Sequence, residues 1–208
     1  MKVPLAILMF LMVGTPVQAN PNETPKDSHA FSNYTSTRRQ YTSADPRWVV
    51  SVTAIPALSL YADKDSDEVN DGIEFDADLN SGSGYAVRLG LGNDSNGIGF
   101  TYVTTQHTET QSGEPARLDA FFLEATHQMW YEHYYYAEVG LGGGGIVFDL
   151  PPGYKNGDGL VGLIRLALGM EPVENVRLQV GVGMFRWGHP GETYGNGSYL
   201  ELGGIVQF

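Results

Sequence analysis

From Arg47 to the last residue, the chain consists of segments in which apolar residues alternate with small or polar ones. Alternation with a period of two predicts β-strands with one apolar face, because successive side chains of a strand point to opposite sides. The connections between these segments are long and short in turn, as residues 62–83 and then 92–97 illustrate. About eight strands joined in this way predict an all-β fold, an antiparallel up-and-down barrel.

The apolar residues of each predicted strand share one face. In chain order they are Trp48, Val50, Val52, Ala54, Pro56, Leu58, Leu60; Tyr85, Val87, Leu89, Leu91; Ile98, Phe100, Tyr102; Ala137, Val139, Leu141; Leu166, Leu168; Val176, Leu178, Val180, Val182, Met184; and Leu200, Leu202, Gly204, Val206, Phe208. The strand at residues 118–131 has no clear facing, because Ala120, Phe121, Phe122 and Leu123 break the alternation.

The opposite face distinguishes a soluble barrel from a membrane barrel. Its polar members are few and of both signs, with glycines between them: Arg88, Glu138, Arg165, Arg177, Gln179, Glu201 and Gln207. The outside of a soluble barrel would be dense in lysine and glutamate. A sparse face instead suits a narrow lumen, where arginine and glutamate pair to offset their desolvation. We therefore predict a transmembrane barrel with its apolar face toward lipid and an interior Arg–Glu network, whose individual pairs stay open.

Aromatic residues gather at both ends of the predicted strands. The short-turn end has Trp48, Trp130, Tyr131, Tyr134, Tyr135, Tyr136 and Phe208, and the long-loop end has Tyr61, Tyr85, Phe148, Phe185 and Trp187. Membrane barrels carry an aromatic girdle at each interface, so we expect these groups to form two girdles.

The N-terminal residues indicate export. Lys2 precedes an apolar stretch at residues 4–13, and Val17 and Ala19 are small residues placed as before a cleavage site. This layout predicts a secretory signal peptide at residues 1–19; the stretch is too short for a spanning helix, which needs about 20 residues. Residues 20–46 are polar and aperiodic, so we expect a flexible arm ahead of a barrel formed by residues 47–208.

Composition excludes some functions. The net charge of −12, from 12 basic and 24 acidic residues, argues against nucleic acid as a partner, because phosphate binding needs a basic face. The chain has no cysteine, so it can form neither disulfides nor a thiolate metal site.

The C-terminal residues 200–208 alternate and end on the aromatic Phe208. With this ending, the passage from Phe75 to Gly90 and the glycine-rich residues 137–144, the chain resembles the small OmpA/OmpX-like outer-membrane barrels of Gram-negative bacteria. The resemblance implies location in the outer membrane, contact with its lipid, and recognition of the last strand by the barrel-assembly machinery. The chain lacks the periplasmic peptidoglycan-binding domain of larger members, so that role is not expected.

Acidic residues in the first long loop are spaced like the ligands of a calcium-binding loop: Asp63, Asp65 and Asp67 match its start, and Asp71 and Glu74 match its later positions. The sixth position, which needs glycine for a sharp turn, is Glu68, and no helical pattern flanks the segment. We interpret the segment as a solvated acidic loop and predict no metal site and no cofactor; calorimetry with millimolar calcium would test this.

Some small barrels modify lipids with a nucleophile and a histidine near the outer rim. The histidines beyond the arm are His107, His127, His133 and His189, and none lies in a recognisable nucleophile–base–orienter arrangement. We therefore expect a non-catalytic barrel with a structural or surface-interaction role and an unnamed surface ligand. A lipid-modifying enzyme and a narrow solute pore are the alternatives.

Overall fold

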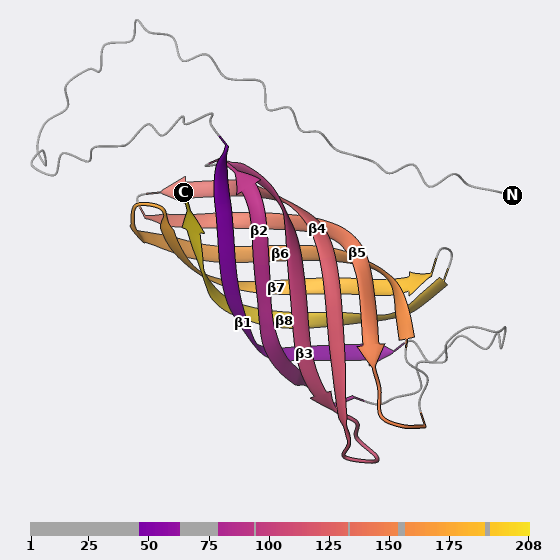
Figure 1. Cartoon of the computed structure of the whole chain (residues 1–208). Coiled ribbons are helices and arrows are strands. Elements are labelled where there is room, and N and C mark those ends of the chain that lie inside the picture. The colour runs from indigo at the N-terminus through magenta and orange to yellow at the C-terminus, as the bar shows by residue number, and fades with distance from the viewer. Residues whose placement is uncertain (1–45, 63–78, 94, 133, 154–156, 190–191) are drawn as a thin grey trace, which may run out of the picture. The chain divides into compact units, whose positions relative to one another are not determined.

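The computed structural model describes residues 46–62, 79–93, 95–132, 134–153, 157–189 and 192–208. They form eight strands: β1 (Arg47–Ala62), β2 (Gly82–Gly92), β3 (Asn96–Thr108), β4 (Pro115–Glu132), β5 (Tyr135–Asp149), β6 (Gly157–Val173), β7 (Val176–His189) and β8 (Glu192–Gln207). Each strand pairs antiparallel with its neighbours in chain order, and the sheet closes into a barrel, which confirms the predicted fold class (Figure 1). Within the described residues, no helix is long and apolar enough to cross a membrane.

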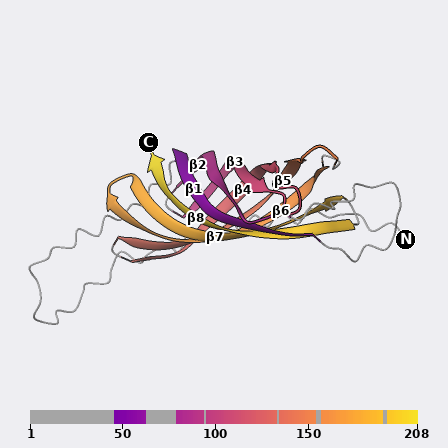
Figure 2. The same ribbon diagram turned by 90° about the horizontal axis from the view of Figure 1, so that it is seen from below.

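The barrel closes between the first and last strands, which lie side by side in Figures 1 and 2. Val50 is the register partner of Val206. At the strand ends, Trp48 N donates to Phe208 O at 3.0 Å, and Phe208 N donates to Trp48 O at 3.1 Å. Hydrogen bonding therefore continues to the last residue, and neither strand leaves an open edge there.

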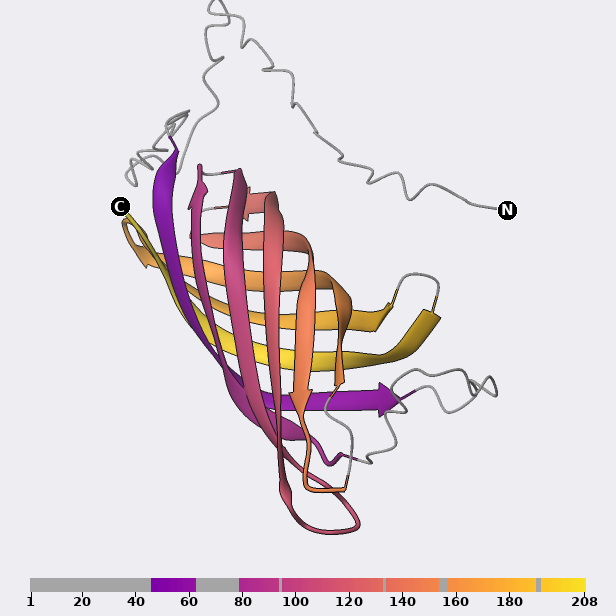
Figure 3. The same cartoon turned by 45° about the vertical axis from the view of Figure 1, so that its right-hand side comes forward.

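The β2–β3, β4–β5 and β6–β7 turns lie at one end of the barrel with Arg47 and Phe208; we name this the short-turn end and the other the long-loop end. At the long-loop end the β3–β4 hairpin reaches past the neighbouring strands (Figure 3). Residues 188–198 are mostly strand, because β7 and β8 stay paired as far as His189 and Glu192.

The apolar face points outward, as predicted. Val180 and Val206 are 44% and 46% exposed, whereas Arg165 and Glu201 are each 4% exposed. The inside of the barrel thus holds the charges and the outside holds the aliphatic side chains. This is the inversion that separates a membrane barrel from a soluble one.

The first strand departs from the prediction at a β-bulge between Ile55 and Leu58. Pro56 lies in this bulge, where a residue without an N–H is tolerated in a sheet. The extra residue shifts the alternation, so that Leu58 is fully buried in the lumen and Leu60 packs beside it. The prediction that these two leucines share the face of Trp48 was wrong.

Burial also shows which side chains point into the lumen in β4 and at the long-loop end of the barrel. In β4, Phe121 and Leu123 point outward while Ala120 and Phe122 are buried in the lumen. At the long-loop end, however, three residues predicted for the girdle lie inside the barrel instead: Phe148, Phe185 and Trp187. Tyr61 and Tyr85 remain exposed on the outside, so the girdle expected there keeps only these two of its five members.

Candidate functional site

The lumen contains a cluster of charges at mid-height, the charge cluster, formed by Arg88, Glu124, Glu138, Arg165 and Glu201. Arg165 lies at its centre: its Nε donates to Glu124 Oε1 at 2.8 Å and its Nη1 to Glu201 Oε1 at 2.9 Å. Its Nη2 donates to Glu138 Oε1. One guanidinium thus binds three carboxylates from three different strands, the rigid multidentate geometry to which arginine is suited.

Arg88 is the second cation of the charge cluster, and its contacts are looser. Its Nε lies 4.0 Å from Glu124 Oε2, and its Nη1 lies 3.8 Å from Glu138 Oε1. Its Nη2 donates to Thr126 Oγ1 at 3.1 Å, and Thr101 donates to Glu124 Oε2 at 2.8 Å. The cluster holds three carboxylates and two guanidiniums, an excess of one negative charge if all five are ionised.

The predicted Arg–Glu network is present, and the structure assigns its pairs. Arg88, Glu138, Arg165 and Glu201 come together, but Glu124, which binds both arginines, was missed because the facing of its strand was ambiguous. Its own charge was the available signal, since a carboxylate in mid-strand would not face lipid.

A second polar group lies nearer the short-turn end. Arg177 pairs with Glu171 at 3.4 Å and lies over the ring of Tyr136, 5.2 Å from its centroid. Tyr136 donates to Gln179, which donates to Glu201 at 3.1 Å. These contacts join the short-turn end to the charge cluster through side chains alone.

Large inward side chains lie over glycines of neighbouring strands. A Cβ on Gly169 would be 2.3 Å from the ring of Tyr136, and one on Gly183 would be 2.1 Å from the ring of Tyr199. On Gly140 it would be 2.3 Å from a carboxylate oxygen of Glu124. The inward glycines therefore give the narrow lumen room for aromatic and charged side chains.

The long-loop half of the lumen is filled by an apolar layer. Its members are Ile55, Leu58, Ala86, Val103, Ala116, Leu118, Ala120, Phe122, Ile146, Phe148, Leu150, Val161, Leu163, Phe185, Trp187 and Tyr199. Phe148 and Phe185 flank Trp187, with ring centroids 5.4 and 5.8 Å from it, and Tyr199 continues the series beside Phe185. The lumen is thus polar in one half and apolar in the other, a division that the sequence analysis did not predict.

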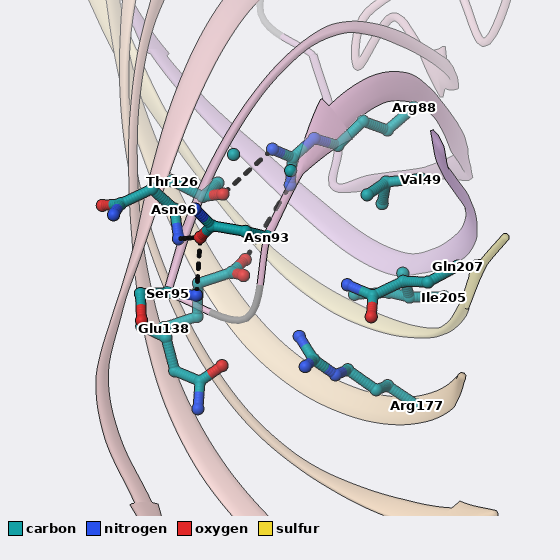
Figure 4. A pocket seen from close by; sticks show the side chains of 13 residues that line it. Val49, Arg88, Asn93, Ser95, Asn96, Thr126, Glu138, Arg177, Ile205 and Gln207 are labelled. Atoms are coloured by element: carbon teal, nitrogen blue, oxygen red, sulfur yellow. Dashed lines mark hydrogen bonds and ion pairs between the residues drawn. The ribbon is translucent and has the colours of Figure 1, made fainter. Parts of the chain in front are cut away.

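At the short-turn end the polar half contains a small hollow that opens to solvent (Figure 4). Asn93, Ser95 and Asn96 of the β2–β3 turn lie on one side of it, and Arg88 and Arg177 point into it from the other. Ser95 and Asn96 both donate backbone N–H groups to the side chain of Asn93, which fixes the turn.

The histidines are distributed over different parts of the barrel. His107 is buried near the long-loop end, with Nε2 2.9 Å from Thr105 Oγ1 and Nδ1 3.0 Å from the carbonyl oxygen of Asn80. His127 lies outside near the short-turn end and contacts Asn96. His133, the side chain of His189 and the acidic segment from Asp63 to Glu74 lie outside the described residues.

A surface group of polar residues lies outside the barrel toward the long-loop end. Asp119 accepts from Tyr102 at 2.8 Å and pairs with Arg117 at 3.0 Å, and Arg117 also donates to Tyr102. In the part of the chain that the structure covers, no three His, Cys, Asp or Glu residues form a group that could hold a metal ion.

No protein-family model matches the chain, and no curated protein matches it in sequence. Among solved structures, Neisserial surface protein A (NspA) has a TM-score of 0.53 over 78% of this chain and 97% of that chain, at 13% sequence identity. The fold is that of an eight-stranded outer-membrane β-barrel. The resemblance to such barrels noted from the sequence is confirmed at the level of the fold.

Two further structures are similar at lower scores. The β-barrel domain of Pseudomonas aeruginosa OprF has a TM-score of 0.44 at 12% identity, over 77% of this chain and 97% of that chain. Ail of Yersinia pestis has a TM-score of 0.43 at 11% identity, over 78% of this chain and 97% of that chain.

Proposed function

We propose that the protein is an integral barrel of the bacterial outer membrane with a structural or surface-interaction role and no catalysis. The observation that carries this proposal is an apolar belt around a filled lumen. Each strand contributes an exposed apolar side chain to the belt: Val52, Leu89, Phe100, Leu123, Leu141, Ile164, Val182 and Leu202.

The belt has the height of a bilayer. The exposed aromatic residues Trp48 and Tyr61 mark the two ends of the belt on β1. They are about 13 residues apart, which at about 3.3 Å per residue and a tilt of about 40° gives roughly 30 Å. The hydrocarbon core of a bilayer is also about 30 Å thick, so the height of the apolar belt matches that thickness.

Insertion is tested by folding the chain without residues 1–19 into lipid vesicles. A folded membrane barrel should migrate differently on a gel before and after boiling, and it should stay with the vesicles in alkaline carbonate. A chain that remains monomeric and folded in buffer without any amphiphile would contradict the proposal.

Orientation is tested by thiol labelling, because the chain has no cysteine of its own. Ser112 lies exposed in the β3–β4 turn at the long-loop end, and Ser95 lies exposed at the short-turn end. On intact cells, a membrane-impermeant maleimide should label Ser112→Cys and leave Ser95→Cys unlabelled until the cells are lysed. The reverse pattern would place the long loops in the periplasm and refute a role at the cell surface.

A solute pore is the second candidate. The apolar layer argues against it, because buried aromatic rings occupy the long-loop half of the lumen. Planar bilayers containing the protein should show no stable large conductance steps, and such steps would favour the pore.

A lipid-modifying enzyme is the third candidate, and Thr105 beside His107 is the pair that would favour it. Thr105 is 1% exposed, and the second imidazole nitrogen of His107 faces a backbone carbonyl rather than a carboxylate, so the pair lacks access and an acidic partner. Mass spectrometry of lipopolysaccharide incubated with the protein should show an unchanged acyl pattern.

We further propose that the barrel-assembly machinery recognises the last strand through Phe208. The support is its position: the side chain is exposed beside the closing pair of strands. Phe208→Ala keeps both backbone hydrogen bonds, so it should fold in detergent like the parent but accumulate less in the outer membrane of cells. Phe100→Ala, an equally exposed belt residue, is the matched control and should accumulate normally.

A further inference from the structure

The outer wall of the barrel contains an arginine that the protein itself leaves unpaired. Arg186 is exposed on β7, between the buried side chains of Phe185 and Trp187, and therefore points away from the lumen. Among the described residues it is the one basic side chain without a hydrogen bond or an ion pair. Arg117, which also faces outward, is paired with Asp119 at 3.0 Å. Arg186 is therefore available to a group outside the protein.

The register of the strands places Arg186 inside the apolar belt, below its edge at the long-loop end. Because the strands are tilted, the row of register partners that starts at Val50 near the short-turn end climbs around the barrel and reaches Tyr61 after one full turn. Arg186 and then Asn196 occupy the last two places in this row before Tyr61. Since Tyr61 marks the edge of the belt, the backbone of Arg186 lies roughly 6 Å below that edge.

Polar side chains accompany Arg186 on the neighbouring strand β8 (Figure 1). Asn196 is its register partner there and Ser198 lies diagonally beside it, and both are exposed. Directly opposite residues have Cβ atoms about 5 Å apart, and diagonal ones about 7–8 Å. On β6 the register partner is Gly162, where an added Cβ would have nothing within 4 Å. The three polar side chains thus border an open place on the wall.

An arginine at this height favours an anionic group of the lipid. A charge on the lipid face costs about 2–4 kcal/mol at the bilayer midplane and less near the interface, so we expect the long side chain to extend toward the headgroups. Its guanidinium has only donors, in a planar fork that fits the oxygens of a phosphate. Asn196 and Ser198 add an amide donor and a hydroxyl donor. A terminal phosphate has three free oxygens for these three side chains, whereas the phosphate of a diester has two.

We propose that Arg186, Asn196 and Ser198 bind the terminal phosphate of a membrane lipid whose acyl chains lie along the belt beside Gly162. This site rests on the proposed function, because it can form only if the wall faces lipid. It deepens that function by naming the class of lipid that the barrel holds near its long-loop end.

The test is native mass spectrometry of the folded protein released from nanodiscs that contain dioleoyl phosphatidic acid and dioleoyl phosphatidylglycerol in equal amounts. Both lipids are anionic and have the same acyl chains, but only phosphatidic acid has a terminal phosphate. We expect the parent protein to retain phosphatidic acid about fivefold more than phosphatidylglycerol, the effect of roughly one additional hydrogen bond.

Two arginine substitutions supply the variant and its matched control. Arg186→Gln removes the charge but keeps a polar side chain, and it should abolish the preference for phosphatidic acid. Arg117→Gln should keep the preference, because Arg117 also lies outside near the long-loop end but is already bound to Asp119 and Tyr102. Gel migration before nanodisc assembly checks that each variant is folded.

Equal retention of the two lipids by the parent would overturn the site, and this readout needs no variant. A preference that survives in Arg186→Gln, or that is lost equally in Arg117→Gln, would also overturn it, because the lipid would then not be held by Arg186 specifically. Insertion into the nanodisc is measured separately by gel migration. A barrel that inserts without the preference refutes this site alone, whereas a chain that does not insert refutes the proposed function as well.

Discussion

Replacing Arg165 by methionine would measure how far the charge cluster stabilises the barrel. The substitution keeps an unbranched side chain in the lumen but removes the guanidinium that binds Glu124, Glu138 and Glu201. Three buried carboxylates would then share Arg88, which lies 3.8–4.0 Å from two of them. Removing one partner of a buried ion pair costs about 3–5 kcal/mol, and here the one arginine pairs with three carboxylates.

The measurement is the free energy of unfolding in lipid vesicles, from urea titrations followed by tryptophan fluorescence and checked by gel migration. We expect Arg165→Met to lower it by at least about 3–5 kcal/mol at neutral pH. The control is Arg117→Met, which breaks a pair with Asp119 on the outside of the barrel. That arginine side chain is 51% exposed, so solvent screens the pair and the loss should be much smaller than for Arg165→Met.

A compensating substitution shows whether the loss of stability in Arg165→Met comes from unpaired charge or from altered packing. If uncompensated carboxylates cause the loss, adding Glu201→Gln to Arg165→Met should restore part of the stability, because it removes one buried negative charge. An Arg165→Met barrel within about 1 kcal/mol of the parent would refute the reasoning, because the cluster would then contribute little net stability.

Three further predictions concern the glycines, the lipid-facing wall and the seal of the lumen. Gly169→Ala should destabilise the barrel by about 1–3 kcal/mol in the same titrations because its Cβ would enter an aromatic ring, whereas Gly162→Ala, with nothing within 4 Å, should be close to neutral. Val182→Arg, in the belt, should cost about 2–4 kcal/mol, and Asn196→Arg, near the long-loop interface, about 0–1 kcal/mol; equal costs would contradict the position of the belt. Phe148→Ala should raise single-channel conductance above that of the parent in planar bilayers, because it removes a ring from the apolar layer; an unchanged trace would show that the seal lies elsewhere.

Much of the architecture could be predicted because lipid and lumen impose opposite demands on alternate residues. The facing of β2, β3 and β5 to β8 followed from alternation alone, and so did the inner position of Arg165. Charge was the reliable marker, since an arginine or a glutamate in mid-strand is costly on the lipid side.

Prediction failed where both faces of a strand are apolar. Phe148, Phe185 and Trp187 belong to the apolar layer, and hydropathy cannot separate a lumen filled with rings from a girdle of rings. Alternation could have separated two of them, because Phe185 and Trp187 are out of phase with Met184, which points outward. In β1 the phase itself changes at the bulge near Pro56, which a pattern of strict alternation does not anticipate.

The three carboxylates around Arg165 come from β4, β5 and β8, while the arginine itself comes from β6. No single hairpin contains this set, so the cluster cannot be completed until the five consecutive strands β4 to β8 have paired. Until then these ionised groups need water, and an open sheet could not bring them into a bilayer at low cost. Pairing of these strands and loss of water from the interior should therefore accompany each other in the maturation of this barrel.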